Sequence, residues 1–106
     1  MRILFDHGTP APLRHALLDH EISTAYEMGW AELNNGDLLG AAENQFEVLI
    51  TTDQNLRYQQ NLEGRRLAVL VLPTTSWPQI QNHTGEIADA VKPLKSGDFL
   101  ELRFKK

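Results

Sequence analysis

Two short apolar runs, each closed by an aspartate, organise the hydrophobic pattern of this chain. Residues 2–5 lead into Asp6, and residues 48–50 lead through two threonines into Asp53. A continuous apolar run bounded by turn signals predicts a strand that is buried on both faces, which is typical of parallel sheets. Because α/β folds bind their ligands at the carboxyl ends of such strands, we expect both aspartates at one functional edge.

The rest of the pattern alternates helical and extended segments. Leu13, Leu17 and Leu18 recur at helical spacing and are expected to be buried on one helix face. Ser76, just before Trp77 and Pro78, favours the start of a later helix. The expected strands are residues 2–6, 22–26, 47–52, 67–72 and 99–104, and the expected helices are residues 10–19, 37–46 and 77–91.

This order of elements predicts an α/β fold: a mostly parallel five-stranded sheet with helices on both faces, in three layers. Right-handed crossovers restrict the topology, and a strand order of 2-1-3-4-5 places the first and third strands side by side. Neighbouring strands are ~4.8 Å apart. In that order Asp6 and Asp53 are neighbours at one edge, whereas the last strand, which alternates apolar and charged residues, lies at the rim of the sheet.

Composition narrows the class of protein. The 106 residues suffice for one domain over residues 1–106, and the net charge of −4 argues against a protein that coats nucleic acid generally, although not against a nuclease. The absence of cysteine excludes disulfides and thiolate metal sites and fits a reducing cytoplasm. No apolar run approaches the ~20 residues that cross a bilayer, and the first strand does not read as a signal peptide. We therefore expect a cytoplasmic protein without a membrane partner.

Asp6 and Asp53 are candidate metal ligands. Two carboxylates this close repel each other, and a divalent cation between them removes that cost. Oxygen ligands without His or Cys favour Mg²⁺ or Mn²⁺, and such a site binds phosphate oxygens and activates a water. Asp37, in the first turn of the second helix, is a candidate third carboxylate.

Each aspartate also has a purely local interpretation. Asp53 would cap the turn that begins at Gln54, and Asp6 would form a turn with the Gly8 region. Asp37 would only cap its helix or complement the helix dipole. The site hypothesis depends on the convergence of the strand-end acids rather than on any one of them.

Polar side chains around these acids are candidate substrate contacts, Arg57 being the best placed for phosphate. For the polar cluster Asn55, Tyr58, Gln59 and Gln60, the alternative role is that of a solvated helix face. Trp77 is a candidate to stack on a base, although packing beside Pro78 is the favoured interpretation. The substrate-binding candidates are His7, Thr51, Asn55, Arg57, Tyr58 and Gln59.

The segments around the acids resemble small PIN-like domains related to the VapC toxins. Residues 3–10 resemble the opening strand, acid and Pro-led helix of that family, and residues 50–56 resemble its Thr-x-Asp motif. Residues 35–39 resemble the helix that carries its middle acid. The resemblance covers at least residues 1–72, and it departs at His7, where many members have Glu, and at Asn55, where many have a second Asp.

The resemblance implies a metal-dependent ribonuclease, often the toxin of a toxin–antitoxin pair, in which Asp6, Asp37 and Asp53 match the acids that hold Mg²⁺ or Mn²⁺. RNA and an antitoxin-like protein are the partners it implies. The alternative is a catalytically degenerate PIN-like module that binds nucleic acid or a protein partner without chemistry, which the two departures favour. A third hypothesis is a homodimer formed through the edge strand at residues 99–104.

Overall fold

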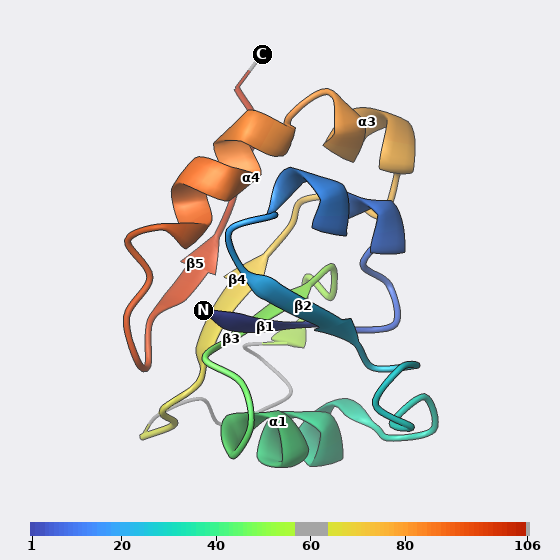
Figure 1. The fold of residues 1–106 in the computed structure, drawn as a ribbon, viewed down its shortest axis with the longest axis vertical. Coiled ribbons are helices and arrows are strands. Elements are labelled where there is room, and N and C mark those ends of the chain that lie inside the picture. Colours follow the sequence, from blue (N-terminus) through green and yellow to red (C-terminus); the bar gives the residue numbers. More distant parts are fainter. Residues whose placement is uncertain (57–63, 106) are drawn as a thin grey trace.

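The central sheet is parallel throughout. The computed structural model describes residues 1–56 and 64–105, and its five strands lie in the order β2-β1-β3-β4-β5 (Figure 1). This confirms the α/β fold class, the strand order and the edge position of the last strand. The strands are β1 (Arg2–Phe5), β2 (Glu21–Thr24), β3 (Val48–Thr51), β4 (Ala68–Val71) and β5 (Phe99–Glu101).

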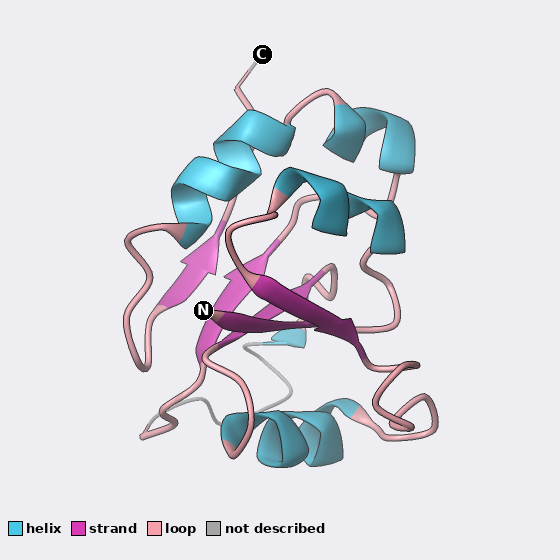
Figure 2. Ribbon diagram, in the orientation of Figure 1, coloured by secondary structure: helices cyan, strands magenta, loops and turns pink. Residues whose placement is uncertain are grey.

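Helices cover both faces of the sheet and complete three layers (Figure 2). One face carries α1 (Asn35–Glu43), and the other carries the 3₁₀ helix η1 (Ala11–Ala16), α3 (Trp77–Gln81) and α4 (Thr84–Val91). Figure 1 shows α1 on one side of the sheet and η1, α3 and α4 on the other.

The core is divided into two halves by the sheet. Side chains alternate between faces along a strand, so Leu49 packs in the half that contains Leu39 of α1, whereas Ile50 packs in the half that contains Ile80 and Ile87. All four residues of β3 are buried. A strand covered on both faces needs apolar residues on both, which explains its continuous apolar run.

The first helix differs from the prediction over residues 10–19. It is a six-residue 3₁₀ helix that follows Pro10, and its first bond joins Leu13 N to Pro10 O at 3.1 Å. The helix ends at Ala16, its cap residue Leu17 is buried like Leu13, and the chain turns at the next residue. The predicted burial of Leu18 is wrong, because this side chain is 80% exposed.

The predicted helix over residues 77–91 is two helices, α3 and α4. The break falls at His83, whose φ of −129° is not helical. The His83 ring stacks on Phe104 with 4.3 Å between centroids, and its Nδ1 lies 2.8 Å from Glu86 Oε1. These contacts hold the break against the end of the chain, and they also explain why β5 is shorter than the predicted strand over residues 99–104.

Candidate functional site

The register of β1 and β3 places Asp6 beside Thr51 at the carboxyl edge of the sheet. Phe5 pairs with Ile50, and the ladder continues with a bond from Asp6 N to Ile50 O at 3.1 Å. The two strands whose ends carry the predicted acids are therefore direct neighbours.

Asp6 is almost fully buried, with 8% of its surface exposed. Its Oδ1 accepts hydrogen bonds from Thr9 N at 3.1 Å and from Thr9 Oγ1 at 2.7 Å. The hydroxyl of Thr51 donates to its Oδ2. The carboxylate thus forms the local turn that its sequence position suggested, and it also binds a residue of the neighbouring strand.

The Thr51 hydroxyl joins the two predicted acids. It donates to the Asp6 carboxylate and accepts a bond of 3.1 Å from the backbone N–H of Asp53. Thr51 is 2% exposed. This side chain was predicted as a substrate contact, and the structure shows it fixing the ends of β1 and β3 to each other.

Asp53 lies half-buried just beyond β3, and both of its carboxylate oxygens accept hydrogen bonds. Oδ1 accepts from Asn55 N at 2.9 Å, which is the expected local turn. Oδ2 accepts from Asn35 Nδ2 at 2.6 Å, and this bond ties the first residue of α1 to the sheet edge. Sequence reasoning did not select Asn35, although its Asn-Asn-Gly context, two residues before Asp37, was the available signal.

Asp37 occupies the first turn of α1 and is exposed. Its backbone N–H donates to Asn34 Oδ1 at 2.8 Å, so Asn34 rather than Asp37 caps the helix. In residues 1–56 and 64–105, no three His, Cys, Asp or Glu side chains form a group that could hold a metal ion. The structure therefore links the Asp6 carboxylate to the backbone of Asp53 through Thr51, and it leaves Asp37 outside that hydrogen-bonded group.

The other candidates divide into three cases. His7 is exposed, with its Nε2 3.3 Å from Trp30 O. Asn55 is exposed beside Asp53. Trp77 is partly buried and packs against the core, which matches the favoured packing interpretation. Arg57, Tyr58 and Gln59 lie outside the described residues.

Gln54 adds a contact that the sequence did not reveal. Its side-chain amide donates to the Leu72 carbonyl just beyond β4 and lies 3.4 Å from Thr52 O. The turn that follows Asp53 is therefore attached to the end of the next strand as well as to α1.

A pocket of about 600 Å³ opens beside Asp6, on the side of the edge that faces β2. It lies between the start of η1 and the turn after β2. Asp6 is one of its lining residues, which also include His7, Arg14, Ala25, Tyr26 and Glu27.

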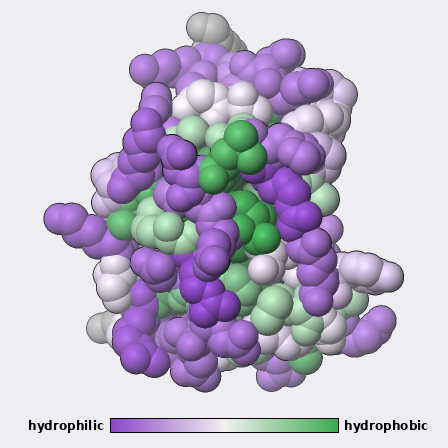
Figure 3. Space-filling view, in the orientation of Figure 1, coloured by the Kyte–Doolittle hydropathy of each residue, from purple (hydrophilic) through white to green (hydrophobic). Residues whose placement is uncertain are grey.

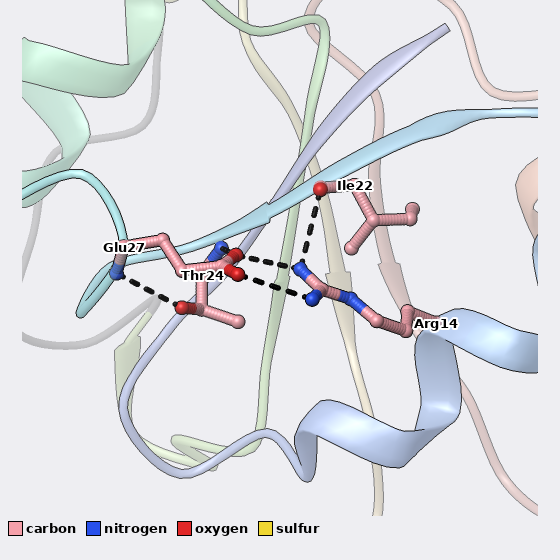
Figure 4. A network of polar contacts seen from close by, with 4 residues as sticks. All are labelled: Arg14, Ile22, Thr24 and Glu27. Carbon is pink, nitrogen blue, oxygen red and sulfur yellow. Dashed lines mark hydrogen bonds and ion pairs between the residues drawn. The ribbon is translucent and has the colours of Figure 1, made fainter.

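An ion pair between Arg14 and Glu27 forms one wall of this pocket (Figure 4). Arg14 Nη1 and Nη2 donate to the two Glu27 oxygens at 3.1 and 2.6 Å, and Nη2 also approaches Ile22 O at 3.3 Å. The hydrogen bond from Arg14, with a second from Thr24 N, lowers the pKa of Glu27 to about 2. The same pair raises the pKa of Arg14. Both groups are therefore charged at neutral pH, and their charges compensate each other.

Comparison with known proteins adds no relative. No family model, no curated protein and no solved structure matches the chain. Among the described helices, none has the length and apolar character needed to cross a membrane.

Proposed function

We propose that the protein is a PIN-like ribonuclease that cleaves RNA phosphodiesters with Mg²⁺ or Mn²⁺ held by Asp6 and Asp53. The observation that supports this most is the Thr51 bridge. The Asp6 carboxylate and the backbone N–H of Asp53, which lie 47 positions apart in the sequence, bind one hydroxyl at the edge where parallel sheets bind their ligands. Neither local turn alone requires that link.

The chemistry of the donor groups suits such a cation. The carboxylates of Asp6 and Asp53, the hydroxyl of Thr51 and the amide of Asn35 offer only oxygen ligands, which favour Mg²⁺ or Mn²⁺. Each carboxylate oxygen already accepts a hydrogen bond, but an ionised carboxylate has about four acceptor positions. Asp37 follows Asn35 by two residues on α1 and is the proposed further acid.

When bound, the cation would supply binding of a phosphate oxygen and a water of lowered pKa. In this proposal Asp6 and Asp53 hold it. Thr51 and Thr9 fix the Asp6 carboxylate, and Asn35 orients that of Asp53. A role as the toxin of a toxin–antitoxin pair belongs to the same proposal, with an antitoxin-like protein as partner.

Cleavage of a labelled single-stranded RNA in Mn²⁺ tests the proposal. Wild-type protein should cut it, EDTA should stop the reaction, and Asp53→Asn should reduce the rate to background because one carboxylate ligand is lost. Asp89→Asn is the matched control, since Asp89 is an exposed acid on α4. Equal inactivity of wild-type protein and Asp53→Asn in pure preparations would overturn the catalytic proposal.

A second candidate is a PIN-like module that binds RNA or a protein partner without chemistry. It is favoured by the hydrogen bonds that already occupy both oxygens of Asp6 and of Asp53. Binding of RNA that EDTA leaves unchanged, with no turnover, would support this candidate. Sedimentation of the purified protein tests the related proposal of a homodimer through the β5 edge.

A further inference from the structure

An exposed tyrosine stands on the pocket beside Asp6. Tyr26 is 81% exposed, and among the large apolar side chains of the described residues only Leu18, at 80%, is as exposed. Residue 26 was expected to lie in the second strand, but β2 ends at Thr24 and Tyr26 lies in the turn that follows. An aromatic ring held in a turn at the functional edge has an open face for a ligand.

The pocket has the size of a small-molecule site. Its volume of about 600 Å³ lies within the ~300–1,000 Å³ of such sites. Space exists there because small residues line much of the wall, among them Gly8, Ala11, Ala25 and Ala31. Because Asp6 lines the pocket, a ligand bound there is next to one of the proposed metal ligands.

The charges of the wall favour a neutral ligand group. Arg14 is the arginine that lines the pocket, and its two terminal nitrogens donate hydrogen bonds to Glu27. Its positive charge is therefore compensated before a ligand binds. A phosphate would find no free arginine there and would face the Glu27 and Asp6 carboxylates. A flat, uncharged nucleobase avoids that repulsion and gains a stacking partner in Tyr26.

We propose that this pocket binds one base of a single-stranded RNA, stacked on Tyr26, next to the phosphodiester that the Asp6–Asp53 edge cleaves. The position of the scissile phosphate rests on the proposed function, whereas the base site rests on the pocket and Tyr26. Bases inside a duplex are stacked on one another, so the site selects unpaired RNA. Stacking accepts every base, so the site discriminates little between sequences.

Binding of a short single-stranded oligoribonucleotide that carries the fluorescent base 2-aminopurine tests this site. EDTA in the measurement prevents metal-dependent cleavage, and low salt strengthens binding of the RNA. Wild-type protein should quench the fluorescence, and Tyr26→Ala should weaken binding by about 5- to 100-fold, because the stacking partner is lost. Tyr26→Phe keeps the ring and should bind within about twofold of wild type.

Leu18→Ala is the matched control, because Leu18 is 80% exposed and does not line this pocket. It should bind the oligonucleotide as wild type does, and a duplex of the same sequence should show no dependence on Tyr26. Equal affinities of Tyr26→Ala and wild type would overturn the base site. So would a loss in Tyr26→Phe as large as that in Tyr26→Ala, because the ring would then not be the contact.

The two proposals fail separately. Loss of RNA cleavage in Asp53→Asn, together with no effect of Tyr26→Ala on binding, would leave the nuclease and remove the base site. Binding that depends on Tyr26, together with no cleavage by wild-type protein, would leave the base site and remove the nuclease.

Discussion

The hydroxyl of Thr51 is the smallest feature on which the site depends. It pairs with Asp6 Oδ2 and with Asp53 N while 2% exposed. Thr51→Val keeps the shape but leaves both groups without that partner, so the free energy of unfolding should fall by about 1–3 kcal/mol. Urea denaturation measures the change. The exposed Thr75→Val should stay within about 0.5 kcal/mol of wild type, and an equally small effect of Thr51→Val would show that the bridge does not stabilise the fold.

The Arg14–Glu27 pair predicts a dependence of stability on acid. The pKa of Glu27 is lowered from 4.5 to about 2 in the folded protein, so its contribution is present above pH 4.5 and is lost as the pH falls towards 2. Glu27→Gln should therefore have a lower thermal midpoint than wild type at pH 7, and the two should converge near pH 2. Arg14→Gln should show the same convergence. A difference that stays constant from pH 7 to pH 2 would exclude the ionised pair as its cause.

At the residue scale, the sequence revealed the acids but not their partners. The positions of Asp6 and Asp53 at the carboxyl ends of β1 and β3 were predictable, because Asp6 directly follows an apolar run and Asp53 follows one after two threonines. The bonds to Thr9 and Asn35 were not, because they depend on turn geometry and on side-chain rotamers rather than on periodicity. Tyr26 was not predicted as a contact, because its exposure depends on β2 ending at Thr24 rather than at residue 26.

At the element scale, the strands were predictable and the helices were less so. The central strands are buried on both faces, so their apolar runs carry a strong signal. Helix ends instead depend on distant contacts: His83 interrupts the predicted last helix, where it stacks on Phe104, 21 positions away. The start of α1 shows the functional consequence, because the Asn34 cap fixes the turn from which Asn35 reaches Asp53.

The distribution of hydrophobic side chains on the outer surface also depends on the helices and strands beneath it. Figure 3 shows hydrophilic side chains over most of one face, with hydrophobic ones gathered over η1 and β2. The exposed Leu18 just after η1 and the partly exposed Ile22 of β2 line one shallow surface pocket. The 3₁₀ geometry of η1 therefore changes both the core and the surface relative to the helix that leucine spacing predicted.

At the scale of the whole molecule, one sheet forms a wall of both halves of the core. Leu39 of α1 and Ile87 of α4 are fully buried on opposite faces. Either residue changed to Ala should lower the free energy of unfolding by about 2–5 kcal/mol. Because alternate residues of the same strands complete both halves, loss of one half should unfold the other, as in the two-state behaviour of small domains.

The two tryptophans make this cooperativity measurable. Trp30 packs against the half that contains α1, and Trp77 packs against the half that contains α3 and α4. In Trp77→Phe the fluorescence reports the first half, and in Trp30→Phe it reports the second. Within each variant the fluorescence and far-UV circular dichroism transitions in guanidinium chloride should coincide, with Leu39→Ala or Ile87→Ala shifting both together. A fluorescence transition that moved only when its own half was mutated would mean that the two layers unfold separately and that the sheet does not couple them.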